Sequence, residues 1–383
     1  MTRTWRNWMP AVAITGVLGA GALVVPLTAN AAVDLPDLSA AEVLELAASH
    51  SVDALSGTVE QTSDLGLPDL SLIGGAAGGA AISPAPGAET GSDGPAAATP
   101  ESAVLEMLTA PHTARIFLNG PSQARVQVLD DMAERNIILN GGDLWFYDSE
   151  ENSAVHSILP DHDQEARQLS DVPTPDRLAG LFLEKADPST EVAVGSDRMV
   201  AGRAAYQLVL TPRAAETLME SITIDVDAET GLPLAVSVAA AGASTPAFSI
   251  AYTNISFEAP PAKTFDFTPP DGATVTEAPD EAQHRAPDKQ AKDSPGPTDT
   301  DEPTDAAEPS ATGTGWATVI EFPAGSSATA DPTVAGMIDQ LGTPVDGGQI
   351  LQTRLLNVLL TDDGRVLVGS VPADRLQAVA DGE

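Results

Sequence analysis

Consecutive segments between residues 200 and 257 alternate between apolar and more polar side chains. The apolar positions recur every second residue, and they are Tyr206, Leu208 and Leu210; Ile222, Ile224 and Val226; Leu234, Val236 and Val238; and Phe248, Ile250 and Tyr252. Successive side chains of a β-strand point to opposite sides, so each segment gathers its apolar residues on one face. The pattern predicts an antiparallel sheet that is covered on one face only.

Earlier segments extend this sheet. We predict a strand over residues 55–65 and further strands over 113–118, 123–130, 135–139, 143–147 and 154–159, separated by turn-forming residues. Helices are predicted over 39–48, where Ser39 and Glu42 form a capping box, over 100–110, and from Thr174 with Pro175 at its first position. The fold class is therefore α+β, a curved antiparallel sheet of about ten or eleven strands that is partly closed by short helices.

The N-terminus resembles a secretory signal peptide. Arg3 and Arg6 precede an apolar run over residues 11–27, and Ala29-Asn30-Ala31 follows as a cleavage site. We expect residues 1–31 to be removed after Ala31, which places the protein outside the cell or in its envelope. The alternative is that the same segment is retained as a membrane anchor.

Composition divides the rest of the chain. Residues 73–100 are rich in Gly, Ala, Pro and Ser and predict a flexible insertion within a main domain over residues 38–271. Residues 278–312 are acidic and rich in proline, which predicts a disordered linker. Apolar patterning resumes over residues 314–380 and predicts a small C-terminal α+β module.

Charge and cysteine usage exclude several classes of function. The formal net charge is −37, so the chain should repel nucleic acid and anionic headgroups. The chain contains no cysteine, which excludes disulfides, thiolate metal sites, thiol catalysis and a lipid-modified cysteine. We therefore expect no nucleic-acid partner.

Motifs for catalysis are absent from the sequence. Asp161-His162-Asp163 is the one cluster that resembles an acid–base or metal site, and no second His or Glu stands at ligand spacing. The acids of the segment 227–231 fit a hairpin turn better than a cation site. We expect no catalytic residues, no metal and no cofactor, and a hydrolase would need Asp161–Asp163 to lie in a cleft beside another titratable group.

Several local segments resemble one superfamily. They are Leu55–Val59, Arg125–Leu129, Asn140–Asp148, Val200–Leu208 with its G-x-x-x-Y-x-L pattern, and Asp227–Leu234 with its D-x-x-T-G-L-P turn. In these segments and in the order of its elements, the chain is similar to the LolA/LolB lipoprotein-carrier family and its relative, the sigma-factor regulator RseB. The similarity is closest to a secreted branch from high-GC Gram-positive (actinobacterial) bacteria.

This resemblance implies an incomplete antiparallel β-barrel, capped by helices, whose apolar cavity accepts acyl chains. The implied function is a non-catalytic binding protein for lipid or lipoprotein acyl chains. The alternative is an RseB-like regulatory module that works with a membrane-bound envelope protein. The missing cysteine, the insertion, the linker and the C-terminal module depart from the family pattern.

The residues predicted to line the cavity are Ile116, Val126, Val128, Leu139, Trp145, Tyr147, Tyr206, Leu208, Ile224, Val236, Ile250 and Phe257. An ordinary packed core would have the same sequence pattern, so that alternative stays open. Which strand face looks inward is also open between Ile137 and Tyr147.

Overall fold

The computed structural model describes residues 34–67, 111–129, 133–159, 174–184, 189–278, 309–326, 338 and 341–382. The predicted signal peptide, the insertion, the helix over 100–110, the loop with Asp161–Asp163 and most of the linker lie outside these residues. Residues 327–337, 339 and 340 of the predicted C-terminal module also lie outside them.

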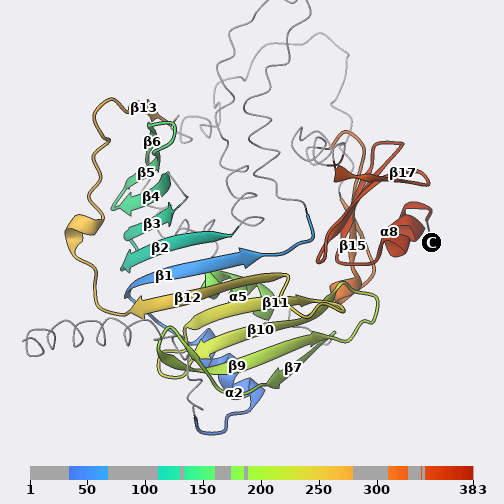
Figure 1. Cartoon of the computed structure of the whole chain (residues 1–383), viewed down its shortest axis with the longest axis horizontal. Helices are drawn as coiled ribbons and strands as arrows, with labels where there is room; N and C mark the ends of the chain where they lie inside the picture. The colour runs from blue at the N-terminus through green and yellow to red at the C-terminus, as the bar shows by residue number, and fades with distance from the viewer. Residues whose placement is uncertain are drawn as a thin grey trace, which may run out of the picture.

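One large open sheet dominates the described residues (Figure 1), and its strand order is β13-β6-β5-β4-β3-β2-β1-β12-β11-β10-β9-β7, with β8 also paired to β9. The strands are β1 (Ala54–Ser63), β2 (His112–Asn119), β3 (Gln123–Leu129), β4 (Glu134–Asn140), β5 (Asp143–Asp148), β6 (Ser153–Ile158), β7 (Thr190–Val194), β8 (Arg198–Val200), β9 (Arg203–Pro212), β10 (Met219–Asp227), β11 (Pro233–Ala240), β12 (Phe248–Ser256) and β13 (Thr274–Glu277).

The predicted fold class is confirmed, since the sheet is mostly antiparallel, curls without closing and carries short helices. It has 13 strands, more than the expected number, because the short strands β7, β8 and β13 were not predicted. The one parallel pair among these strands joins β13 to β6 at the sheet edge.

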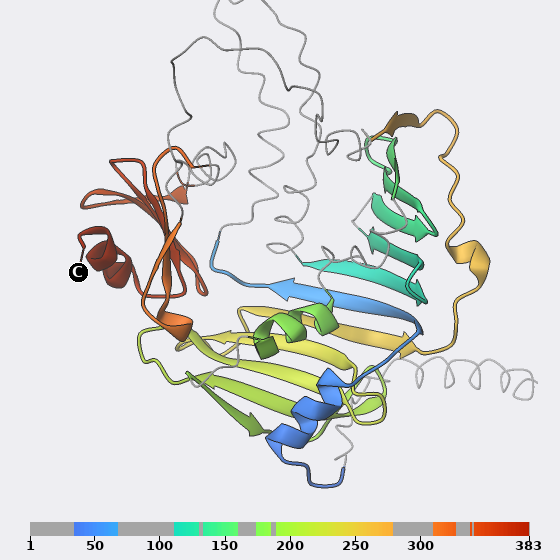
Figure 2. The same cartoon turned by 180° about the vertical axis from the view of Figure 1, so that it is seen from behind.

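Two helices, α2 (Ala40–Ala48) and α5 (Pro175–Glu184), lie across the same face of the sheet, over β9–β12 (Figure 2). We call this the inner face. The predicted capping box of α2 is present. The Ser39 hydroxyl accepts a hydrogen bond from the Glu42 amide, and the Glu42 carboxylate accepts one from the Ser39 amide. Gly231 in the β10–β11 turn has a positive φ of 76° and lies against the Leu46 carbonyl, so a larger residue there would collide with α2.

The alternating residues of β9–β12 form the main core beneath these helices. The inner-face side chains are almost fully buried, and they are Tyr206, Leu208, Leu210, Ile222, Ile224, Val226, Val236, Val238, Phe248, Ile250 and Tyr252. The helices contribute Val43, Ala47 and Ala179 to the same cluster. A stripe of apolar residues on each helix therefore covers the apolar face that the sequence predicted.

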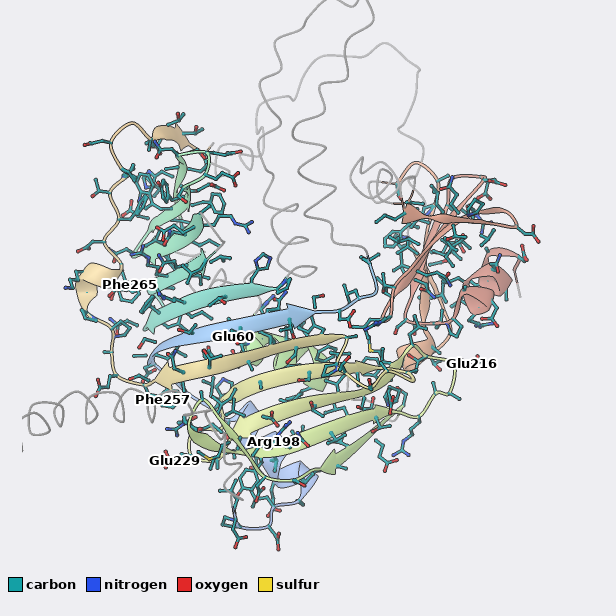
Figure 3. All side chains as sticks on the ribbon, viewed as in Figure 1. Glu60, Arg198, Glu216, Glu229, Phe257 and Phe265 are labelled. Atoms are coloured by element: carbon teal, nitrogen blue, oxygen red, sulfur yellow. The ribbon has the colours of Figure 1, made fainter. Side chains whose placement is uncertain are left out.

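A return segment, residues 257–273, crosses the opposite or outer face of β3–β6 on its way from β12 to β13. Phe265, just after the short helix η1 (Ala262–Thr264), is 1% exposed (Figure 3). Arg125 of β3 donates a hydrogen bond of 3.1 Å to the Thr264 carbonyl. We call this segment the strap, because this hydrogen bond ties it to the outer face of β3.

The C-terminal module is a second sheet of order β14-β15-β19-β18-β17-β16. Its elements are β14 (Ser310–Thr312), the short helix η3 (Gly315–Ala317), β15 (Val319–Phe322), β16 (Thr343–Val345), β17 (Gly348–Gln352), β18 (Asn357–Thr361), β19 (Val366–Gly369) and α8 (Ala373–Ala380). Leu367 and Leu359 pack against Leu376 of α8. The module begins inside the stretch predicted as linker, since β14 occupies residues 310–312.

The module contacts the large sheet at several points. The Leu218 amide donates a hydrogen bond of 2.9 Å to the Ser370 carbonyl, and the Arg354 amide donates one of 2.8 Å to the Leu65 carbonyl. Arg354 also forms an ion pair with Asp64. The two backbone hydrogen bonds and the ion pair lie at the ends of β1 and β10, so the module is docked on the sheet.

Candidate functional site

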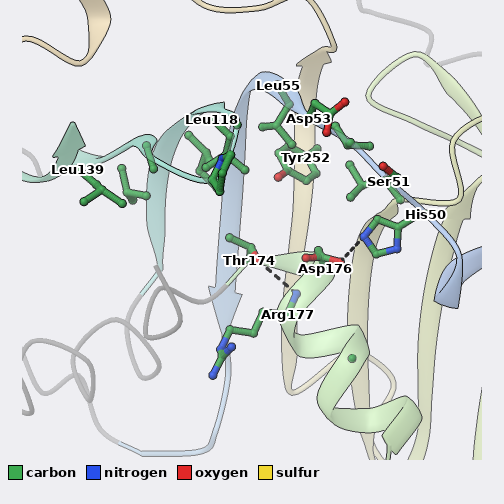
Figure 4. A pocket seen from close by; sticks show the side chains of 18 of the residues that line it. His50, Ser51, Asp53, Leu55, Leu118, Leu139, Thr174, Asp176, Arg177 and Tyr252 are labelled. Carbon is green, nitrogen blue, oxygen red and sulfur yellow. Dashed lines mark hydrogen bonds and ion pairs between the residues drawn. The ribbon is translucent and has the colours of Figure 1, made fainter. Parts of the chain in front are cut away.

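A cavity of about 690 Å³ lies between the inner face of β1–β4 and α5 (Figure 4). Its lining residues are His50, Ser51, Val52, Asp53, Leu55, Ile116, Leu118, Gly120, Pro121, Ala124, Val126, Leu139, Thr174, Asp176, Arg177, Gly180, Leu181, Leu232 and Tyr252. This volume lies within the usual range for small-molecule sites.

Strand register gives the cavity an apolar floor. One row runs across four neighbouring strands and consists of Leu55, Leu118, Ala124 and Leu139, each paired with the next. Ile116 and Val126 form a second paired row beside it. Because directly paired residues share a face of the sheet, these side chains present one continuous apolar surface.

Polar residues gather at the opposite end. Figure 4 shows Leu118 and Leu139 at one end of the cavity and His50, Ser51 and Asp176 at the other. The Thr174 hydroxyl accepts a hydrogen bond of 3.2 Å from the Arg177 amide and so caps α5. The cavity is therefore amphipathic, with a floor of aliphatic side chains and a rim that carries charge.

An ion pair crosses this rim. The Nε2 atom of His50 lies 3.1 Å from Asp176 Oδ1. Hydrogen bonding to Asp176 raises the pKa of His50 above its ordinary value, and burial opposes this effect. The pair joins the chain just after α2 to the first turn of α5.

Tyr252 of β12 marks the border between the cavity and the packed core. It lines the cavity, yet it is only 3% exposed. Burial raises the pKa of its hydroxyl, and the nearby Asp176 charge acts in the same direction. The hydroxyl is therefore neutral at physiological pH and is available as a hydrogen-bonding group at the cavity wall.

Nine of the twelve predicted cavity residues lie on the inner face, and they fall into three groups. Ile116, Val126 and Leu139 line the cavity. Val128 shares their face but is 3% exposed in the core. The residues from the later strands form the packed core under the helices rather than a cavity wall, and they are Tyr206, Leu208, Ile224, Val236 and Ile250. For these five positions the alternative of an ordinary core describes the structure.

Trp145 and Tyr147, which were predicted to line the cavity, lie on the outer face. Trp145 pairs with Ile138, whereas Phe146 pairs with Ile137 and so shares the inner face with Val126. The rings of Trp145 and Tyr147 lie 5.3 Å and 5.5 Å from the ring of Phe267 in the strap. The strap supplies apolar cover for these two aromatic side chains.

Phe257 also lies away from the cavity. The Arg203 guanidinium carbon lies over the Phe257 ring, 4.8 Å from its centre. Figure 3 labels Phe257 near Glu229. Arg203 forms an ion pair with Asp227 and another of 2.7 Å with Glu229. The acids of the predicted hairpin turn are thus engaged by an arginine, and Asp227 also accepts hydrogen bonds within the turn.

Sequence reasoning missed several lining residues. Leu55 and Leu118 belong to predicted strands and follow the alternation of their neighbours, so the pattern contained them. His50, Asp176 and Arg177 carry no local motif, because they meet only when α5 packs beside the end of α2.

The cavity has the geometry of a binding site. Within the described ranges, no group of three or more His, Asp or Glu side chains is arranged to hold a metal ion. Asp161–Asp163 lies outside the described residues. An apolar floor with a charged rim can hold an amphiphile, with its chain on the floor and its polar end at the rim.

No protein-family model matches the sequence. A search of curated proteins gives no significant match either. Among solved structures, the chain is similar to the MucA/MucB complex of Pseudomonas aeruginosa, with 17% identity over 89% of this chain and 96% of that one, at a TM-score of 0.37.

It is also similar to a LolA superfamily protein from Nitrosomonas europaea, with 11% identity over 60% of this chain and 99% of that one, at a TM-score of 0.22. A DUF1329 family protein from Desulfovibrio piger shares 11% identity over 59% of this chain and 97% of that one, again at 0.22. These similarities concern the fold alone.

Proposed function

We propose that this protein is a non-catalytic binding protein that holds an acyl chain of a lipid or lipoprotein in the cavity. The observation that carries the proposal is the row Leu55-Leu118-Ala124-Leu139, which forms an unbroken aliphatic floor beneath a charged rim. Removing apolar surface from water is favourable, so a hydrocarbon chain that covers this floor should bind there.

The energy of such binding is large enough to matter. Each methylene removed from water contributes about 0.8 kcal/mol, so a sixteen-carbon chain yields roughly 12 kcal/mol before ordering costs. Association and ordering remove an estimated 4–15 kcal/mol of that gain. Net affinity therefore depends on how completely the cavity encloses the chain, and residues of the floor should have graded effects.

Export belongs to the same proposal. The basic and apolar pattern of residues 1–31 supports secretion with cleavage after Ala31, to the cell envelope or the extracellular space. In the part of the chain that the structure describes, none of the helices combines the length and the apolarity that crossing a membrane requires.

Gly180 offers a direct test, because it lines the cavity on α5 and a Cβ atom built there meets no atom within 4 Å. Gly180→Trp should place an indole in the cavity. We expect it to abolish uptake of a fluorescent fatty acid. Gly180→Ala is the matched control, since it changes the same backbone position, leaves the cavity open and should bind as the wild type does.

Native purification followed by lipid extraction and mass spectrometry provides the second readout. The wild type and Gly180→Ala should carry co-purified lipid, and Gly180→Trp should not. A wild-type protein that carries no lipid and takes up no fatty acid contradicts the proposal, as does a Gly180→Trp protein that binds like the control.

A regulatory module that acts through a membrane-bound envelope protein is the second candidate function. One observation favours it: α5 contacts both the cavity and the C-terminal module, because the Phe182 ring lies 6.4 Å from the ring of Trp316. A helix shared in this way connects cavity and module. A pull-down with the wild type should capture one membrane protein, and a variant with residues 309–382 replaced should fail to capture it. Capture by both proteins counts against this function.

A further inference from the structure

Both ring nitrogens of His50 face groups that can only accept hydrogen bonds. Nε2 faces the Asp176 carboxylate at 3.1 Å, and Nδ1 faces the Ala47 carbonyl. A neutral imidazole carries a single N–H and satisfies one of these acceptors, whereas the imidazolium satisfies both. The observed geometry is that of a protonated His50.

The position of this pair gives it a mechanical role. His50 follows α2 and Asp176 lies in the first turn of α5, and both line the cavity rim (Figure 4). Further along the helix, the fully buried Ala179 packs α5 into the main core. The ion pair therefore restrains the end of α5 that borders the cavity.

We propose that His50 and Asp176 form a protonation-dependent clasp that restricts entry to the cavity when His50 is charged and frees the N-terminal end of α5 when it is neutral. This inference rests on the proposed binding function and adds its regulation. Loss of the proton removes one of the two hydrogen bonds and the charge that holds Asp176. The end of α5 then remains attached only through the apolar face of the helix.

Other charges around His50 do not replace this pair. Arg177 lies beside Asp176 on α5, Asp53 lies on the following segment and Glu45 lies one turn back on α2. The β10–β11 turn packs against His50 at Gly231, and its acids Asp227 and Glu229 are both engaged by Arg203. From β12 the facing titratable group is Tyr252, which stays neutral.

The direction of the pH effect follows from the raised pKa of His50. The clasp is complete below the ordinary histidine pKa of about 6.5 and is lost as pH rises through the raised value in the folded protein. Entry to the cavity should therefore be slow in mildly acidic solution and fast in mildly alkaline solution.

The test measures the association rate of a fluorescent lysophosphatidylcholine, whose headgroup keeps its charge between about pH 5 and pH 8.5, a range that spans the histidine transition. For the wild type, association should be slow at the acidic end of this range and fast at the alkaline end, with the transition centred above the ordinary histidine pKa of about 6.5. His50→Gln and Asp176→Asn should associate at the fast rate at every pH.

His156→Gln is the matched control. His156 also lies between two carboxylates, Asp143 at 3.0 Å and Glu277 at 2.9 Å, but on the outer face away from the cavity. Its replacement should preserve the wild-type pH profile. The two single variants of the clasp remove opposite partners, so a folding defect in one leaves the other to decide.

Binding that shows the same association rate at every pH overturns the clasp and leaves the binding function standing. A pH profile that survives in both His50→Gln and Asp176→Asn also overturns it. Failure of the wild type to bind the probe at any pH instead defeats the binding function on which the clasp rests.

Discussion

The Trp316 indole nitrogen donates a hydrogen bond of 2.8 Å to the hydroxyl of Thr190, the first residue of β7. This bond ties the C-terminal module to the edge of the large sheet, where the Phe182 ring completes the contact from α5. Because Thr190 is 6% exposed, its hydroxyl has little access to water and depends on this partner.

Replacing Trp316 should loosen the module. We expect Trp316→Ala to lower the free energy of unfolding by about 2 kcal/mol, since it removes both the ring contact and the hydrogen bond. Trp316→Phe keeps an aromatic ring and should cost about 1 kcal/mol, the value of one hydrogen bond. Urea unfolding measures both, and equal effects of the two variants would show that the hydrogen bond alone matters.

Two glycines should respond oppositely to the same substitution. A Cβ at Gly57 of β1 would lie 2.8 Å from the Asn254 carbonyl oxygen and from the Tyr252 ring, so Gly57→Ala should destabilise by about 1–3 kcal/mol. Gly180→Ala meets open space in a helix and should stabilise by up to about 1 kcal/mol. Thermal unfolding of the pair checks this, and a shared sign would contradict the close approach of β12 to β1.

The ion pair between Arg203 and Asp227 should dominate local stability at the β10–β11 turn. Asp227 has a side chain that is 1% exposed, so Arg203→Leu leaves a buried carboxylate without its charged partner and should cost about 3 kcal/mol. The double variant Arg203→Leu/Asp227→Asn should recover part of this loss. A double-mutant cycle in urea decides, and additive effects would mean that the two groups do not interact.

The same pair predicts an acid-side pH dependence. Burial raises the pKa of Asp227, but hydrogen bonds from Arg203 and Thr230 outweigh burial and hold it below the ordinary value. Its contribution is therefore present above the unfolded aspartate pKa of about 3.9 and is lost as pH falls through the lower folded value. Stability curves of the wild type and Arg203→Leu should converge in that acidic range.

The strap should be testable through tryptophan fluorescence. After removal of residues 1–31, Trp145 and Trp316 are the remaining tryptophans, so Trp316→Phe leaves Trp145 as the single reporter. Adding Phe267→Ala should shift its emission to the red, because one ring that shields it is removed. Phe265→Ala should instead cost about 3–5 kcal/mol in stability, since that side chain is fully buried.

The alternation of residues predicted the inner face of β9–β12 correctly because each of those strands has one apolar side. It failed at β5, where Trp145-Phe146-Tyr147 is apolar throughout, and at Ile137-Ile138-Leu139 in β4. In such runs both faces of the strand carry apolar side chains, because one face belongs to the inner face of the sheet and the strap covers the other. A distant segment supplies that second cover, so no local pattern announces it.

The same limit applies to the cavity. Leu208 and Leu118 occupy equivalent alternating positions, yet helices fill the space above the first and leave space above the second. Whether a strand face is filled depends on where α2 and α5 come to lie, and the charged rim depends on the meeting of His50 and Asp176. These are tertiary outcomes that residue spacing within a strand does not contain.

The interior is thus divided between a solid half under the helices and a hollow half over β1–β4. This separation has an evolutionary consequence. Exchanges at Leu118, Ala124 or Leu139 can enlarge, shorten or reshape the hollow half while the solid half continues to carry the fold. Related proteins with this division can therefore change the size and shape of the ligand that they bind through a few aliphatic substitutions, while the stability of the fold is preserved.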